Sequence, residues 1–250
     1  QNQSSAASDV YKRQVLMLTH VNYRDGSLHD MADLTRAAHD AGALVVWDLA
    51  HSAGALRVDL AGCHADFAVG CGYKYLNGGP GAPAFLYVAP RHHGGFRQPL
   101  SGWFGHRDPF EFTPQYDAAG DIGQYLCGTP PVLSMVALDA ALDVWEGVNM
   151  TALRAKSQAL TGYFIELVET RCAGHGLTLI SPRNPDARGS QVSFTHAQGG
   201  YAIISALIAD GVIGDFRAPD VLRFGFTPLY TSFADAVSYT HLTLPTTGSV

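Results

Sequence analysis

Short apolar runs alternate with an amphipathic segment along the first 90 residues of the chain. Residues 28–42, LHDMADLTRAAHDAG, carry apolar positions at helical spacing and end in a glycine, which predicts a helix. Strands that alternate with helices are typical of a mostly parallel sheet covered on both faces. Four apolar runs predict the strands: VLMLTH (15–20), ALVVWDLA (43–50), DFAVGCG (66–72) and APAFLYVAP (82–90).

The pattern changes after residue 90. Residues 91–131 are irregular and rich in Gly, Pro and aromatic residues, and a loop of this length in a compact domain is usually functional. Two helical patterns follow at 131–148 and 149–172. The remaining pattern predicts strand, strand, helix, strand and strand, ending near residue 228. We therefore expect a large α/β domain over 15–147 and a small α+β domain over 148–236.

The two ends share nothing with the patterned middle. Residues 1–14 and 237–250 resemble peptides translated from sequencing-adapter DNA, so both are treated as artefact-like tails and left out of fold reasoning. We expect both tails to lie outside the core.

Composition narrows the function classes. Hydrophobic residues make up 47% of the chain, charged residues 15%, and the formal net charge is -6, which favours a well-buried enzyme over a nucleic-acid-binding or disordered protein. No apolar run is long enough for a membrane helix, and no signal peptide is evident. The four cysteines are irregularly spaced and are expected to be reduced thiols of a cytoplasmic protein.

One constellation carries chemistry. Asp48 ends the most apolar strand, His51 follows it, and Lys74 comes 26 residues after Asp48 in GCGYKYLNGGPG. Asp48 could be a helix N-cap, His51 a structural turn residue and Lys74 a solvated cation. Together, a lysine in an apolar turn and an aspartate at a strand end suit pyridoxal 5'-phosphate (PLP), which needs a Schiff-base lysine and a carboxylate for its pyridine nitrogen.

The segment DLAHSAGALRVDLAGCHADFAVGCGYKYLNGGPG (48–81) resembles the cofactor-lysine region of the kynureninase family, a class V aminotransferase-like group of fold-type I PLP enzymes. The similarity continues in GWFGH (102–106), GTPP (128–131), ALRAKSQALTGYFIELV (152–168) and LRFGFTPLYTSF (222–233). The resemblance implies the C-terminal part of the large PLP domain followed by a small α+β domain.

The resemblance also assigns roles residue by residue. Lys74 matches the Schiff-base lysine, Asp48 the partner of the pyridine nitrogen, and His51 a histidine beside the cofactor. Tyr73 matches a residue near the phosphate that also moves protons, and Thr19 a hydroxyl residue at the cofactor. Trp103 and Thr129 match residues that reach the phosphate across a dimer interface, and Arg223 matches the arginine that binds the substrate α-carboxylate.

The implied activity is hydrolysis of L-kynurenine, or also 3-hydroxykynurenine, to anthranilate and L-alanine, within tryptophan catabolism and NAD biosynthesis. The implied partner is a second copy in a homodimer with a shared active site, with no nucleic acid or membrane. Gly128 and Thr129 resemble bacterial members, which favour kynurenine. The family's phosphate-binding turn, ring-stacking aromatic residue and second aspartate have no counterpart in this sequence.

Two alternatives remain open. The chain could be a relative of cysteine desulfurases or selenocysteine lyases, although those usually carry His where Tyr73 stands. It could also be an inactive fragment of a PLP enzyme. No metal site is expected, because His92 and His93 point apart and the cysteines lack zinc spacing.

Overall fold

A computed structural model describes residues 14–238, which form two compact units, each described here by itself. The first unit contains residues 14–18, 30–50 and 59–146, and the second contains 19–29, 51–58 and 147–238. The units meet in sequence at Gly147, but the segments 19–29 and 51–58 pack with the second unit rather than with the first. The expectation about the terminal tails falls almost wholly outside the described residues.

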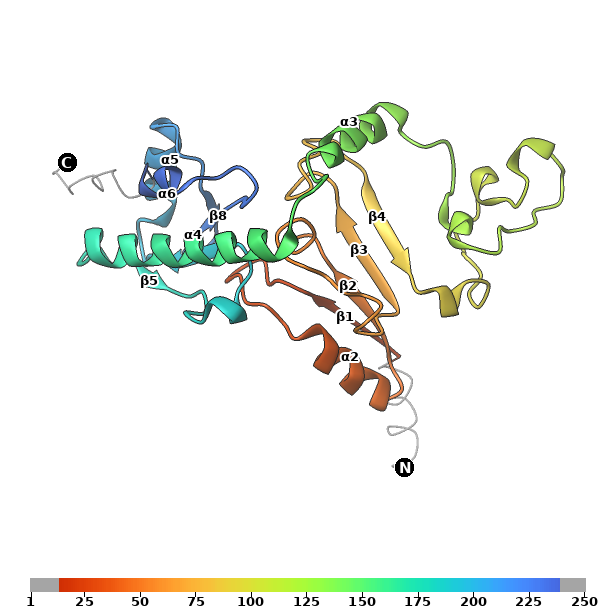
Figure 1. The fold of residues 1–250 in the computed structure, drawn as a ribbon, viewed down its shortest axis with the longest axis horizontal. Coiled ribbons are helices and arrows are strands. Elements are labelled where there is room, and N and C mark those ends of the chain that lie inside the picture. The colour runs from red at the N-terminus through yellow and green to blue at the C-terminus, as the bar shows by residue number, and fades with distance from the viewer. Residues whose placement is uncertain (1–13, 239–250) are drawn as a thin grey trace. The chain divides into compact units, whose positions relative to one another are not determined.

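The first unit is built on a four-stranded sheet in the order β1-β2-β3-β4 (Figure 1). β2 and β3 are parallel, as expected of a mostly parallel sheet, whereas β4 runs antiparallel to β3. The reason is that the connection from β3 to β4 holds no crossover helix, which a parallel pairing would require. The strands are β1 (Val15–Thr19), β2 (Leu44–Asp48), β3 (Phe67–Cys71) and β4 (Ala84–Val88).

The predicted helix of this unit is α2 (Met31–Asp40), which packs against β2. Asp30 caps it, because its side chain accepts a hydrogen bond from the Asp33 N–H. The fully buried Trp47 of β2 donates its indole N–H to Thr35 of the helix at 3.0 Å. This bond satisfies two polar groups inside the interface, so the helix is fixed against one face of the sheet.

A buried carboxylate lies at the amino-terminal end of β3. Asp66 is 2% exposed and precedes β3. Its Oδ2 accepts hydrogen bonds from the Val45 N–H at 2.9 Å and from His39 at 2.7 Å. Its Oδ1 lies 2.7 Å from both Arg91 and His92. Burial by itself would raise the pKa of Asp66, but the hydrogen bonds from His39, His92, Val45 and Arg91 outweigh burial and lower the pKa well below its usual range.

The long irregular segment contains four short 3-10 helices and ends at α3 (Val132–Asp143). None of the residues of α3 is buried in the structure, and Leu133 is 88% exposed. The 3-10 helices are η1 (Pro90–His92), η2 (Trp103–Gly105), η3 (Pro109–Glu111) and η4 (Ile122–Tyr125).

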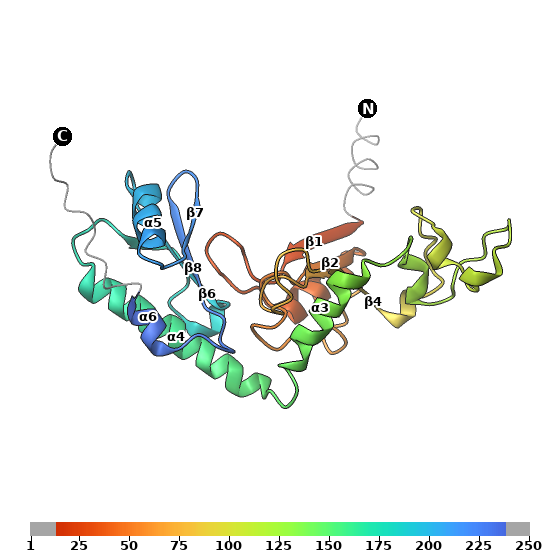
Figure 2. The same cartoon turned by 90° about the horizontal axis from the view of Figure 1, so that it is seen from above.

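The second unit confirms the predicted order of strand, strand, helix, strand and strand. Its sheet has the order β5-β6-β8-β7, and its neighbouring strands pair antiparallel. The long helix α4 (Met150–Arg171) lies within the helical pattern predicted over 149–172 and is capped by Asn149, and α6 lies along it (Figure 2). The other elements are β5 (Thr178–Leu179), η5 (Pro185–Ala187), β6 (Gln191–Thr195), α5 (Gly200–Ala209), β7 (Asp215–Arg217), β8 (Val221–Gly225) and α6 (Phe233–Ser238).

Aromatic packing holds α4 on this sheet. Phe164 is 1% exposed, and its ring centroid lies 6.0 Å from that of Phe194 and 5.1 Å from those of Phe224 and Phe226. Phe194 and Phe224 come from β6 and β8, so one helix residue joins both central strands. Edge-to-face contacts of this kind stabilise a core beyond the burial of area alone.

Candidate functional site

Asp48 is the last residue of β2 and is half-buried. It is the register partner of Val69 in the parallel β3. Its Oδ1 accepts a hydrogen bond from the Ala50 N–H at 2.8 Å, which makes a local turn like the capping interaction considered from the sequence. Polar groups at the carboxyl ends of parallel strands are where open α/β sheets bind ligands.

Lys74 lies in the turn after β3, beyond Cys71. β2 and β3 are parallel, so this turn and Asp48 are at the same edge of the sheet. The Lys74 Nζ lies 5.5 Å from the centroid of the Tyr73 ring, within the range of a cation–π interaction. The Lys74 carbonyl accepts a hydrogen bond from the Asn77 N–H at 2.9 Å, which shapes the turn.

Glycines let the backbone pack tightly around this turn. A Cβ at Gly70 would collide with the ring of Phe85 on β4. A Cβ at Gly72 would lie 2.9 Å from the Pro83 carbonyl oxygen, and the Gly72 carbonyl accepts a hydrogen bond from the Gly78 N–H at 2.9 Å. The bare sequence around Lys74 therefore has a steric cause, because β3, β4 and the following loop approach too closely for side chains.

Tyr73 is 51% exposed, so the turn that the sequence suggested to be apolar places this side chain partly in solvent. Its pKa is raised, foremost by partial desolvation and then by the nearby Cys71 and Asp48. The hydroxyl is therefore a proton donor at neutral pH rather than a phenolate.

Arg223 lies in β8 of the second unit with a side chain that is 10% exposed. Its Nε–H donates to the Asp215 Oδ2 at 2.9 Å, and its Nη2 donates to the same oxygen. Its Nη1 donates to the Tyr23 carbonyl at 2.5 Å. The guanidinium is thus held in one orientation by two partners from β7 and from the segment after β1.

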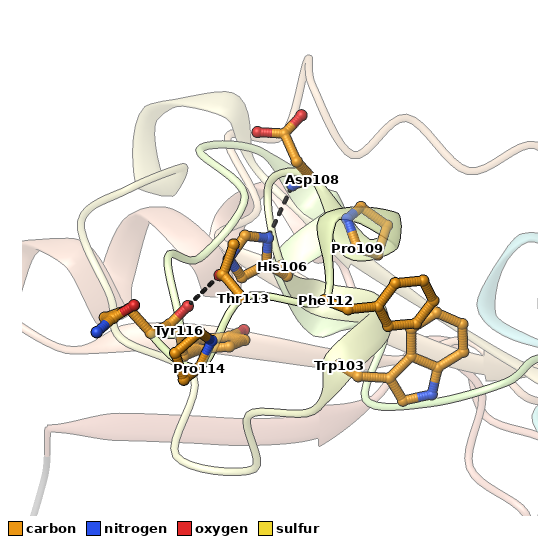
Figure 3. Close-up of a pocket in the computed structure, with 9 residues that line it drawn as sticks. Trp103, His106, Asp108, Pro109, Phe112, Thr113, Pro114 and Tyr116 are labelled. Atoms are coloured by element: carbon orange, nitrogen blue, oxygen red, sulfur yellow. Dashed lines mark hydrogen bonds between the residues drawn. The ribbon is translucent and has the colours of Figure 1, made fainter.

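Trp103 lies in a cavity of about 360 Å³ formed by residues 103–116 (Figure 3). Its ring packs edge-on against Phe104 at 4.9 Å and Phe110 at 5.8 Å between centroids. His106 lines the same cavity, and its Nδ1 accepts a hydrogen bond from the Asp108 N–H at 2.9 Å. Thr129 lies exposed in the segment that precedes α3.

The structure therefore brings together three of the residues selected from the sequence: Asp48, Tyr73 and Lys74, all in the first unit. Thr19 and His51 belong to the second unit together with Arg223, and the Thr19 carbonyl lies 2.9 Å from the Nδ1 of His29. The functional roles assigned to these residues and to Trp103 and Thr129 stay predictions.

Sequence reasoning missed two partners of Arg223. Asp215 is its register partner across β7 and β8, and this pairing could be found only with the strand register known. The Tyr23 carbonyl carries no sequence signal, since any residue supplies the same group. The sequence shows a glycine at position 70, but it does not show that the Phe85 ring leaves no space for a side chain there.

Other chemistry is sparse in the part of the chain that the structure describes. All four cysteines are free thiols. Residues 14–238 hold no group of three or more His, Cys, Asp or Glu side chains arranged to hold a metal ion. No helix in that range has both the length and the apolar character needed to cross a bilayer.

Comparison with solved structures defines the fold. A cysteine desulfurase from Thermococcus onnurineus NA1 aligns with a TM-score of 0.77 at 21% identity, covering 96% of this chain and 61% of that one. A C-DES variant with glycine covalently linked to its PLP cofactor aligns with a TM-score of 0.76 at 17% identity, covering 96% of this chain and 64% of that one. The chain has the fold of the fold-type I PLP enzymes.

Sequence comparison is more specific. Residues 153–242 match the family model described as kynureninase C-terminal domain. A curated kynureninase from Burkholderia mallei (strain SAVP1) is 58% identical over 221 residues, which are 88% of this chain and 53% of that protein. The chain is therefore a relative of the kynureninases, and it spans about half the length of the curated relatives it matches.

Proposed function

We propose that this chain forms the cofactor-lysine part of a PLP-dependent kynureninase. The observation that carries the proposal is the parallel register of β2 and β3, which puts Asp48 and the Lys74 turn at one edge of the sheet. The kinship with curated kynureninases supports the choice of substrate, L-kynurenine. The structural neighbour with a PLP-linked glycine supports the choice of cofactor.

The residues present fit PLP in chemical type. Lys74 supplies a primary amine for the aldehyde, and Asp48 supplies a carboxylate that keeps a proton on the pyridine nitrogen. The glycines around the turn leave backbone close to the site without side chains in the way. When bound, the cofactor supplies an electron sink that stabilises negative charge at the substrate α-carbon.

The chain's own groups then have separate tasks. The Lys74 amine takes the proton from the substrate α-carbon, and the Tyr73 hydroxyl, with its raised pKa, donates a proton in a later step. Arg223 binds the α-carboxylate. Thr19, His51, Trp103 and Thr129 complete the binding of the cofactor.

The overall reaction balances with water alone. Water adds to the side-chain ketone of kynurenine, the bond between its β- and γ-carbons breaks, and a proton goes to the β-carbon. The products are anthranilate and L-alanine. This reaction belongs to tryptophan catabolism and the route to NAD, and the protein acts in the cytoplasm.

Kynurenine is proposed as the better substrate than 3-hydroxykynurenine, on the resemblance of Gly128 and Thr129 to bacterial family members. A homodimer with a shared active site is proposed as the acting form. The exposed apolar residues of the irregular segment and of α3 support the homodimer: Leu100, Trp103, Phe110, Phe112 and Leu133. Association in solution would be measured by sedimentation.

The test is an assay of anthranilate fluorescence with kynurenine as substrate. It uses a full-length chimera in which this chain replaces the matching 221 residues of the Burkholderia mallei relative. We expect the chimera to release anthranilate and the 250-residue chain alone to release none. A folded chimera that binds PLP but releases sulfide from cysteine, and no anthranilate, would instead support the desulfurase alternative.

A further inference from the structure

The inference concerns the carboxylate partner of Arg223. Asp215 and Arg223 face each other in register across the antiparallel strands β7 and β8. The Arg223 Nε and Nη2 both donate to the Asp215 Oδ2, and Nη1 donates to the Tyr23 carbonyl. All these groups lie within the second unit.

The Arg223 guanidinium has more N–H donors than Asp215 and Tyr23 accept. A guanidinium carries five N–H bonds, and three of them are engaged by Asp215 and Tyr23. Asp215 bonds the edge formed by Nε and Nη2. One N–H on Nη1 and one on Nη2 have no partner among residues 14–238, and two neighbouring guanidinium nitrogens of this kind can bind a carboxylate with two hydrogen bonds.

The net charge around Arg223 is positive and so favours the binding of another anion. The Nε of Arg217 lies 3.2 Å from the same Oδ2 of Asp215. One carboxylate therefore lies between two guanidiniums, and the three side chains carry a net charge of about +1 at neutral pH. A second carboxylate bound by the remaining N–H groups of Arg223 would neutralise the group.

We propose that Asp215 is a positioning residue for the carboxylate site: it holds one edge of Arg223 so that the other edge is preformed for the α-carboxylate of an amino-acid substrate. Arg217 holds Asp215 in turn. The proposal rests on the proposed role of Arg223. In this arrangement Asp215 stays bonded to Arg223 when the substrate binds. In the alternative, a gate, the substrate carboxylate would take the place of Asp215 on Arg223.

The experiment uses the 250-residue chain labelled with ¹⁵N-arginine and follows the Arg223 Nε signal by NMR. The probes are L-kynurenine and its decarboxylated analogue, which lacks the α-carboxylate. The variants are Asp215→Asn and, as a matched control, Asp220→Asn, whose carboxylate lies 3.7 Å from Arg24 in the same unit. Urea unfolding of each variant separates a loss of binding from a loss of folding.

We expect kynurenine to shift the Nη signals while the Nε–H keeps its bond to Asp215, and the analogue to leave them unchanged. Asp215→Asn should weaken kynurenine binding about tenfold and alter the Nε signal, because a neutral amide is a weaker acceptor for a charged donor. Asp220→Asn should change neither.

Three results would overturn the proposal: no effect of Asp215→Asn on kynurenine binding, release of the Nε–H when kynurenine binds, or no kynurenine binding to the chain. The assignment of Arg223 itself fails if the intact chain binds kynurenine and its analogue equally. The proposed activity is tested separately. It fails if the folded chimera releases no anthranilate, even where the chain binds kynurenine in preference to its decarboxylated analogue.

Discussion

Asp48 of β2 and Val69 of β3 are register partners in a parallel pair. The strand that ends at Asp48 and the strand that leads to Lys74 therefore finish at the same edge of one sheet. This relationship joins residues that are 26 positions apart into one candidate site. It also agrees with the general placement of ligands at the carboxyl ends of strands in α/β folds.

Arg223→Lys tests whether the guanidinium binds the α-carboxylate of the substrate. The variant keeps the charge but loses the fork, so we expect substrate binding by the chimera to weaken by about 1–3 kcal/mol while PLP affinity stays unchanged. Equilibrium titrations with kynurenine and with PLP measure the two affinities. Equal losses for both would show that Arg223 serves the structure of the second unit.

Gly70→Ala tests the steric account of the turn. The added methyl group would collide with the Phe85 ring, so we expect the free energy of unfolding of the 250-residue chain to fall by about 1–3 kcal/mol. Gly120→Ala is the matched control, because nothing lies within 4 Å of its Cβ position. The collision account predicts that Phe85→Leu recovers part of the loss in a double variant, and strictly additive effects would refute it.

Asp66→Asn tests how much the buried carboxylate before β3 stabilises the fold. The amide keeps an acceptor for the Val45 N–H but loses its charge-assisted bonds to Arg91, His39 and His92. We expect a loss of about 2 kcal/mol in urea unfolding. The exposed Asp33, paired with Arg36 at 2.9 Å, supplies the control variant Asp33→Asn, which should cost less than about 0.5 kcal/mol.

The lowered pKa of Asp66 gives this variant a signature in pH. A carboxyl whose folded pKa is depressed stabilises the fold above its unfolded pKa of about 4 and loses that contribution as pH falls toward the folded value. The stability of the unmodified chain should therefore fall between about pH 5 and pH 3, and more steeply than that of Asp66→Asn. Parallel curves for the two proteins would show that Asp66 is not the group responsible.

The secondary structure followed from the sequence because hydrophobic periodicity and capping residues act locally. The helix predicted over 149–172 is α4 with Asn149 as its cap, and the strand order of the second unit is as predicted. The direction of β4 was not predicted, since it depends on whether the connection from β3 to β4 crosses the sheet.

The site was only partly visible for a similar reason. Asp48 stands out because it ends an apolar strand, and Lys74 because it follows one. Asp215 does not, because its importance comes from a cross-strand register that residue patterns do not specify. The grouping of residues 19–29 and 51–58 with the second unit is likewise a property of packing between distant segments.

The central claim is that Lys74 carries the cofactor, and borohydride reduction of the PLP-loaded chimera followed by peptide mapping tests it most directly. This chain contributes only three lysines, Lys12, Lys74 and Lys156, so the labelled peptide identifies the residue. We predict a stable pyridoxyl label on Lys74, and loss of the label in Lys74→Ala but not in Lys156→Ala. A label on Lys156, on Lys12 or on the half supplied by the relative, with Lys74 unmodified, would contradict the claim.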